Sequence, residues 1–399
     1  MNFYDINGNI IPISGGGKSI NYSDYEKNLE RVIDEDFTTS NSNFTLSNCS
    51  VSSSGLTCTG FASAKYKYIE NLYGEKIAIR FTYTGTVTLG VYLSSTLAYI
   101  DTAGTLSIYT GYTQGSTLPS SPASTDSVSI TSGHEYLLTL FHKGHDYSRA
   151  TLRDLISGEE TTLTSSYSNT RDAKALGISV FNGTATVSKL MYDAPLFSGA
   201  KLLVVGDSIT WGGAVTPYSD SFASKLVTEY FSNDGTICAY GGDSITGGIK
   251  KVTELFERGH KFDYVLMALG TNVDWDRSSN WDYATQISAR RTTFANFDAL
   301  CESRGATLLW GAPPANPNDD LTESLEEAEA DTTTKGYPSR TILRKLIIDV
   351  FGERCIRFDL ATMTNGAYDS QYFADGLHTN AKGQLRQYEF AKAKFDILG

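Results

Sequence analysis

The chain has 399 residues, of which 40% are hydrophobic and 20% charged, and its formal net charge is −12. This length exceeds what one ordinary hydrophobic core organises and suits two or three domains. The acidic balance argues against nucleic acid or an anionic membrane as a partner, and no apolar run approaches the roughly 20 residues of a membrane-spanning helix.

Residues 1–35 are predicted to form a separate leader and linker. The opening "MNFYDINGNIIPISGGG" has no basic start and no long apolar core, so we do not expect a signal peptide or export by the ordinary route. The stretch "SGGGKS" indicates a flexible joint and lacks the spacing of a phosphate-binding loop. After it, "YEKNLERVIDEDF" is expected to form a short helix.

Residues 36–195 are rich in Ser, Thr, Gly and Tyr and contain short runs of alternating polarity, separated by turn signals. These runs are 76–83, 86–93, 134–142, 175–182 and 185–192. The pattern predicts an antiparallel β-sandwich with a jelly-roll-like layout. The many Tyr, Ser and Thr side chains fit a carbohydrate-binding face and equally fit an ordinary strand surface, so both interpretations stay open.

The cysteines give little support for a disulfide framework. Their number is odd and their spacing irregular, at Cys49, Cys58, Cys238, Cys301 and Cys355. Cys49 and Cys58 flank a Ser/Gly turn and would face each other if that turn closed a hairpin. We expect two free thiols there rather than a disulfide.

Residues 199–399 alternate apolar strands with helices. Strands are expected at 201–206, 236–242, 262–270, 306–314 and 354–360, and a last helix at "AKGQLRQYEFAKAKFDIL". Five strands with intervening helices predict a parallel, doubly wound α/β sheet. The active site of such a sheet lies beyond the carboxyl ends of its strands.

Four short motifs fall at this predicted edge. "GDSIT" follows the first strand and contains Ser208, and "YGGDS" follows the second and contains Gly242. "GTN" follows the third strand and contains Asn272, while "DGLH" precedes the final helix and contains Asp375 and His378. Each motif alone is common in turns or at helix starts, but the four together, in this order, indicate a catalytic site.

These residue types suit acyl transfer through a serine nucleophile. Ser208 needs a base to take its proton, and His378 is the predicted base. Asp375 is predicted to fix the tautomer of His378 and to stabilise its charged form. The backbone N–H groups of Ser208 and Gly242 and the side-chain amide of Asn272 are the predicted donors to the oxyanion. The order Ser, Asp, His is known for triads on α/β folds.

On these motifs, the region 199–399 resembles the SGNH hydrolases of the GDSL lipase/esterase family. "GDSIT" is similar to the nucleophile block, "GTN" to the asparagine block and "DGLH" to the Asp-x-x-His block. The block "YGGDS" lacks the asparagine usual a few residues earlier. The resemblance implies Gly242 as the oxyanion donor, with Gly241 as the fallback. Val273 stands where many members carry Asp, a departure expected to alter loop packing rather than the chemistry.

The resemblance implies a three-layer, flavodoxin-like α/β/α fold, no cofactor, and hydrolysis of esters, often of acetyl groups on sugars. A β-sandwich before such a domain is similar to the layout of some carbohydrate esterases. The leader "MNFYDINGNIIPI" loosely resembles the start of tail-associated phage and prophage proteins. That likeness implies action outside the cell on a virion or prophage particle, with the cytoplasm as the alternative location.

Other residues near the motifs have less definite predictions. Trp211 and Trp275 are expected either to wall the acyl or sugar pocket or to serve in ordinary packing. No metal site is predicted, because the remaining histidines lack partners at metal-ligand spacing; they are His134, His142, His145 and His260. The acidic stretch 318–338 is expected to be a solvated helix, with a mobile rim over the site as the alternative.

The leading hypothesis is therefore a serine esterase that removes short acyl groups, above all acetyl, from an acylated carbohydrate. A lipid or thioester hydrolase on the same residues is one alternative. A virion or surface receptor-binding protein with a scaffold-only hydrolase fold is another, and the intact set of Ser, Gly, Asn, Asp and His argues against it. Whether the chain forms a homo-oligomer stays open.

Overall fold

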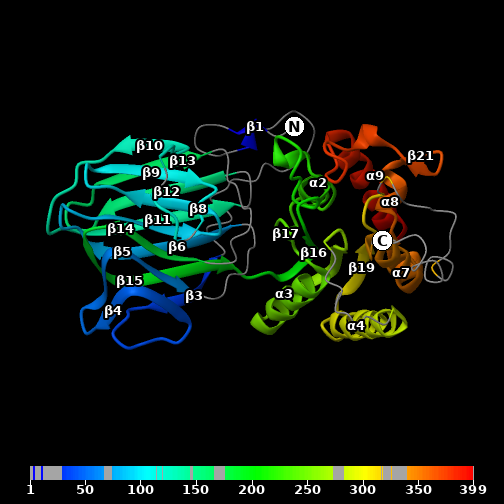
Figure 1. The fold of residues 1–399 in the computed structure, drawn as a ribbon, viewed down its shortest axis with the longest axis horizontal. Coiled ribbons are helices and arrows are strands. Elements are labelled where there is room, and N and C mark those ends of the chain that lie inside the picture. The colour runs from blue at the N-terminus through cyan, green and yellow to red at the C-terminus, as the bar shows by residue number, and fades with distance from the viewer. Residues whose placement is uncertain are drawn as a thin grey trace. The chain divides into compact units, whose positions relative to one another are not determined.

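The computed structural model of the chain describes residues 3–4, 10–11, 29–66, 74–113, 115–118, 120–143, 147–165, 176–272, 283–315, 317, 325 and 339–398. The chain divides into two compact units. One is made mainly of Asn21–Leu196, and the other of Phe197–Gly399 with the short paired strands β1 (Phe3–Tyr4) and β2 (Ile10–Ile11). Figure 1 shows β structure in the first unit and strands with helices in the second.

The first unit is one continuous antiparallel sheet. Its strand order is β10-β9-β8-β7-β14-β5-β15-β6-β11-β12-β13, with β4 beside β5 and β3 beside β15. The strands are β3 (Leu29–Glu35), β4 (Phe44–Ser52), β5 (Gly55–Tyr66), β6 (Glu75–Thr82), β7 (Thr88–Leu93), β8 (Thr96–Ile100), β9 (Thr105–Thr110), β10 (Ser124–Ser127), β11 (Glu135–Lys143), β12 (Tyr147–Asp154), β13 (Glu160–Ser165), β14 (Leu176–Asn182) and β15 (Thr184–Pro195).

Strand β15 lets this sheet fold over itself, because its first residues pair with β5 and its later residues with β6 and β3. The two arms then pack face to face, with β11 against β7 and β8, and β12 against β9. Leu89, Leu138 and Val187 are among the fully buried side chains of the shared core, as the alternation of side chains along a strand allows. The predicted antiparallel domain is confirmed, although a single sheet supplies both layers.

Two expectations for this unit are wrong. From Leu29 to Glu35 the segment expected to be helical is strand β3, because it pairs with β15 and places Ile33 in the core. Cys49 and Cys58 form a disulfide rather than two thiols, because β4 and β5 set them directly opposite in register.

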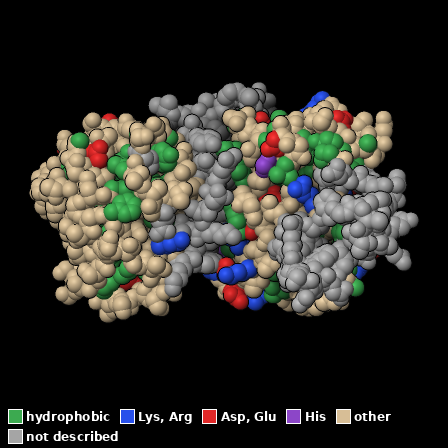
Figure 2. Space-filling model, in the orientation of Figure 1, with side chains coloured by type: hydrophobic (Ala, Val, Ile, Leu, Met, Phe, Trp, Pro, Cys, Tyr) green, Lys and Arg blue, Asp and Glu red, His purple; other side chains and the backbone are tan. Residues whose placement is uncertain are grey.

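The visible face of this unit carries few charged side chains (Figure 2).

The second unit contains the predicted five-stranded parallel sheet, in the order β17-β16-β18-β19-β20. The strands are β16 (Ser198–Gly206), β17 (Gly235–Ala239), β18 (Lys261–Ala268), β19 (Thr307–Gly311) and β20 (Cys355–Ile356). Strand β16 has a neighbour on each side, and its residues 202–205 are fully buried. Burial on both faces explains why the sequence there is an unbroken apolar run.

Helices cover both faces of this sheet. They are α2 (Phe222–Lys225), which continues as a π-helical turn (Leu226–Tyr230), α3 (Ile245–Arg258), α4 (Tyr283–Ser303), α7 (Ser339–Phe351), α8 (Phe358–Ala361) and α9 (Ala381–Leu398). Trp310 of β19 packs on Phe294 of α4 and Phe351 of α7, with ring centroids 4.7 and 5.0 Å apart. Strand alternation places Tyr264 of β18 on the other face, where its ring lies 5.3 Å from that of Phe395 in α9.

A hairpin of β21 (Met363–Thr364) and β22 (Ala367–Tyr368) lies between α8 and α9 in the chain. In the parts of the chain that the structure describes, no helix combines the length and apolar character needed to cross a bilayer.

Candidate active site

Ser208 lies in the tight turn that follows β16. Glycine is required at Gly206, because a Cβ there would come within 1.8 Å of the Thr210 hydroxyl. The Gly213 N–H donates to the Ser208 carbonyl at 2.8 Å and closes the turn. Helix α2 begins at Phe222, after this turn.

Asp375 and His378 share a short loop between Phe373 and Thr379, which pair across it as an isolated antiparallel bridge. The Asp375 oxygen Oδ1 accepts the backbone N–H groups of Leu377 and His378, at 3.0 and 2.7 Å. These two bonds fix the carboxylate within the loop and leave its second oxygen for the imidazole.

The imidazole of His378 lies between Asp375 and Ser208. Its Nδ1 is 2.7 Å from Asp375 Oδ2, and its Nε2 is 3.0 Å from Ser208 Oγ. When Nδ1 donates its hydrogen to the carboxylate, Nε2 is left to accept the hydroxyl hydrogen of Ser208, which is what a general base requires. The structure thus brings together the three residues predicted to be catalytic.

Hydrogen bonds keep the Asp375 carboxyl ionised. The His378 backbone N–H, the His378 ring and the Leu377 N–H together lower the pKa of Asp375 to about 2. The carboxylate is therefore charged at neutral pH. A permanent negative charge at this place stabilises the imidazolium that forms when His378 takes a proton.

Asn272 is held beside the nucleophile turn. Its Nδ2 donates to the Asp243 carbonyl at 3.1 Å and lies 3.4 Å from Oδ2 of Asp207, the residue before Ser208. Gly242 precedes Asp243 in the turn after β17, and its φ of +78° is a conformation that favours glycine. The predicted oxyanion donors therefore come from turns that the Asn272 side chain links.

Asp207 and Asp243 are buried carboxylates beside the site, and the sequence analysis assigns neither of them a role. Burial and the nearby charge of Asp243 raise the pKa of Asp207 to about 7, against the opposing effect of the Ile209 N–H, which donates to it at 2.9 Å. The Tyr240 hydroxyl donates to Asp243 Oδ1, and the Lys251 ammonium lies 4.5 Å from the centre of the Tyr240 ring. Both Asp residues stand inside the quoted motifs, but residue type alone does not reveal their burial.

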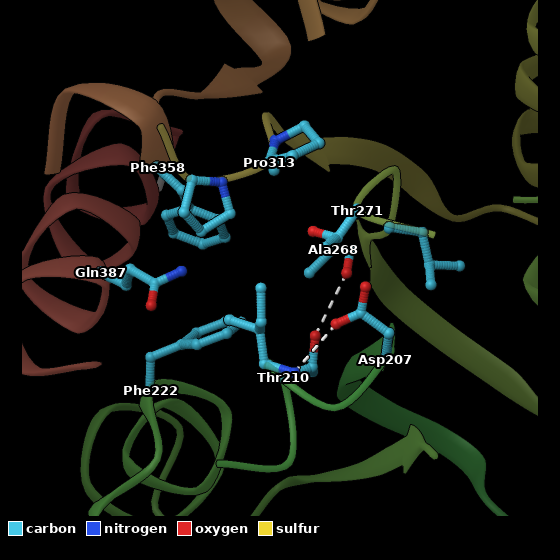
Figure 3. A pocket seen from close by; sticks show the side chains of 12 residues that line it. Asp207, Thr210, Phe222, Ala268, Thr271, Pro313, Phe358 and Gln387 are labelled. Carbon is cyan, nitrogen blue, oxygen red and sulfur yellow. Dashed lines mark hydrogen bonds between the residues drawn. The ribbon is translucent and has the colours of Figure 1, made fainter. Parts of the chain in front are cut away.

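A cavity of about 10 Å³ adjoins Asp207. Figure 3 shows Asp207 on one side of it and the amide of Gln387, from α9, pointing into it from the other. Much of the remaining lining is apolar, including Phe222, Pro313 and Phe358. A space of this size holds about one water molecule, so it is too small to receive an acyl chain.

Of the two tryptophans considered for the pocket, Trp211 is 2% exposed and packs edge-on against Tyr218, with ring centroids 5.1 Å apart. This burial favours the packing interpretation. Trp275, Val273 and nearly all of the acidic stretch 318–338 lie outside the described residues.

Each of the other histidines that the structure describes either makes a hydrogen bond within the fold or is buried. His134 pairs with Asp154 at 2.7 Å, His260 accepts the Phe197 N–H at 3.2 Å, and burial lowers the pKa of His142 to about 4. Position 145 falls outside the described ranges. Within those ranges, no group of three or more His, Cys, Asp or Glu side chains is arranged to hold a metal ion.

No protein-family model matches the chain, and no curated protein matches its sequence. Among solved structures, the Bacillus subtilis protein YXIM is 13% identical and aligns over 84% of this chain and 80% of its own, with a TM-score of 0.37. A GDSL-like lipase from Bacteroides thetaiotaomicron VPI-5482 is 12% identical over 50% of this chain and 87% of its own, with a TM-score of 0.33. Arcelin-5, a lectin-like defense protein from Phaseolus vulgaris, is 8% identical over 42% of this chain and 98% of its own, with a TM-score of 0.33.

Proposed function

We propose that the protein is a serine esterase that removes short acyl groups, above all acetyl, from an acylated carbohydrate. The observation that carries this proposal is the hydrogen-bonded chain from Ser208 Oγ through His378 to Asp375. Such a chain activates a hydroxyl that is otherwise a weak nucleophile. Asn272 lies beside the same turn, where its Nδ2 is 3.4 Å from Asp207 Oδ2, and we propose that this amide turns to the oxyanion during the reaction.

In the proposed reaction, Ser208 Oγ attacks the ester carbonyl carbon while His378 Nε2 takes the hydroxyl proton. The carbonyl oxygen becomes an oxyanion, to which the N–H groups of Ser208 and Gly242 and the Asn272 amide donate. The C–O bond to the sugar then breaks, and His378 returns the proton to the leaving oxygen. Water, deprotonated by His378, then attacks the acyl carbon; the bond from that carbon to Ser208 Oγ breaks, His378 returns the proton to Oγ, and the acid is released.

The preference for a short acyl group is inferred from the polar sequence that follows β19. A long acyl chain needs an apolar groove or lid, since each buried CH₂ contributes roughly 0.8 kcal/mol. The stretch 318–338, which follows β19, is acidic and poor in apolar residues. The carbohydrate assignment rests on the family resemblance of 199–399 and on the Tyr-, Ser- and Thr-rich composition of 36–195.

The test is release of acetate from acetylated polysaccharides, compared with hydrolysis of p-nitrophenyl acetate, butyrate and octanoate. We expect kcat/KM to fall steeply as the acyl chain lengthens, and Ser208→Ala to abolish every activity. A flat or rising profile would favour the lipid or thioester hydrolase. Binding to polysaccharide without hydrolysis would favour the scaffold-only receptor-binding protein.

A further inference from the structure

Gln384, in the first turns of α9, is a buried side chain that contacts both catalytic segments. It is 0% exposed. Its Nε2 donates to the Ile209 carbonyl at 2.7 Å and to the Thr379 hydroxyl at 2.8 Å. Ile209 is the residue after Ser208, and Thr379 is the residue after His378. One amide nitrogen therefore bridges the nucleophile turn and the acid–base loop.

The other end of the same amide fixes the start of α2. Gln384 Oε1 accepts the Phe222 N–H at 2.8 Å, which is one of the backbone donors that a helix leaves unpaired in its first turn. Both hydrogens of Nε2 and the oxygen are thus engaged. A carboxylate or an apolar side chain of similar shape cannot reproduce this pattern, because donor and acceptor must both be present.

The Thr379 hydroxyl extends the bridge. It accepts from Gln384 and donates its own hydrogen to Gln387 Oε1 at 2.9 Å. Gln387 is also 0% exposed, and it touches Thr379 but makes no hydrogen bond to the nucleophile turn among the described residues. This difference makes it a matched control for Gln384, because both are buried amides on the same face of α9.

We propose that Gln384 is a positioning residue that sets the distance between Ser208 Oγ and His378 Nε2. The two atoms stand 3.0 Å apart and belong to segments that Gln384 ties together through their neighbouring residues. Proton transfer from Ser208 to His378 depends steeply on that distance, and a misplacement of about 1 Å costs roughly 100-fold in rate. The proposal rests on the serine esterase function proposed above.

The test compares Gln384→Met with Gln387→Met, both of which keep side-chain volume and remove the amide. For Gln384→Met we expect kcat on p-nitrophenyl acetate to fall about 10- to 100-fold with KM within about twofold, because substrate binding is not touched. Labelling of Ser208 by a fluorophosphonate should slow by the same factor. Gln387→Met removes one hydrogen bond of the side chain rather than three and should keep kcat within about threefold of wild type. All rates are measured below the melting temperature of each variant.

A kcat for Gln384→Met within threefold of wild type, or equal losses in the two variants, would overturn the proposal. If Gln384→Met does not fold, Thr379→Val decides, since it removes only the hydroxyl that joins the loop to Gln384. It should lower kcat and labelling several-fold with KM unchanged, and a normal kcat would overturn the proposal. Failure of the esterase function itself is distinguishable, because wild type and Ser208→Ala would then both lack activity and labelling.

Discussion

Replacing Asp375 by Asn exchanges one carboxylate oxygen for an NH₂ group. His378 Nδ1 would then face a hydrogen-bond donor instead of an acceptor. The carboxylate Oδ1 accepts two backbone N–H groups, from Leu377 and His378, and the oxygen of an Asn side chain would keep those bonds. The NH₂ group would then face His378 Nδ1, where Oδ2 now lies at 2.7 Å. Because an NH₂ group donates only, the imidazole would have to carry its hydrogen on Nε2, toward Ser208.

In that tautomer His378 cannot take the proton of Ser208. The corresponding Asp-to-Asn change in a Ser-His-Asp protease lowers kcat about 10⁴-fold, or about 5.5 kcal/mol in activation free energy. We expect a loss of that size in kcat on p-nitrophenyl acetate, with KM nearly unchanged. Folding should be preserved, because the loop keeps its backbone hydrogen bonds.

Asp369→Asn is the matched control. Asp369 also accepts a backbone N–H in a short turn, from Gln371 at 3.0 Å, and its pKa is also lowered, chiefly by the Thr364 hydroxyl. Its hydrogen bonds do not involve His378, so the control should keep kcat within about twofold of wild type. An Asp375→Asn enzyme with more than a tenth of wild-type activity, or a control that loses as much, would refute the tautomer reasoning.

Ser208→Ala should lower kcat by about 10⁴- to 10⁶-fold and abolish fluorophosphonate labelling without lowering stability; retention of more than a tenth of the activity contradicts its role. Asn272→Ala should cost roughly 10²- to 10³-fold, mostly in kcat, whereas an effect confined to KM would mean ground-state binding. A chain of residues 196–399 should fold alone and hydrolyse p-nitrophenyl acetate, and a soluble but inactive domain would show that the rest of the chain completes the site. Because the pKa of Asp207 is raised from 3.8 to about 7, the native state binds more protons than the unfolded state between these values. Stability should therefore fall by up to about 4 kcal/mol as pH rises from about 4 to about 7; Asp207→Asn should remove this slope in denaturant titrations, and an unchanged slope contradicts the burial argument.

The parts predicted well from sequence are those with a local signal. The buried strand before Ser208 is an unbroken apolar run, and the loop with Asp375 and His378 is a compact motif before an amphipathic helix. Strand topology places Ser208 at the carboxyl end of β16, and the His378 ring reaches it from the loop before α9. The finer roles of Gly242 and Asn272 depend on N–H directions that residue spacing does not specify, and they stay predictions.

The parts missed depend on partners distant in the chain. Strand β3 is stabilised by pairing with β15, about 160 residues later, and its charged alternation resembles a helix surface when seen alone. The disulfide depends on the register of β4 and β5, which the turn between them sets. Gln384 and Gln387 occupy the buried stripe of α9 with Ala391 and Phe395. Their helical spacing with Ala391 and Phe395 indicates that they face the core, but glutamine is a polar residue type that a search for apolar positions passes over.

The separation of Ser208 from His378 by 170 residues has a consequence for the chain while it is being synthesised. At the usual 5–20 residues per second, roughly 10–35 s pass between the two. Throughout this interval the nucleophile turn has neither its base nor the amide of Gln384, which accepts the Phe222 N–H and donates to the Ile209 carbonyl. A nascent chain that ends before His378 thus carries Ser208 without its proposed base, and the proposed acyl transfer requires α9 to have packed against the turn.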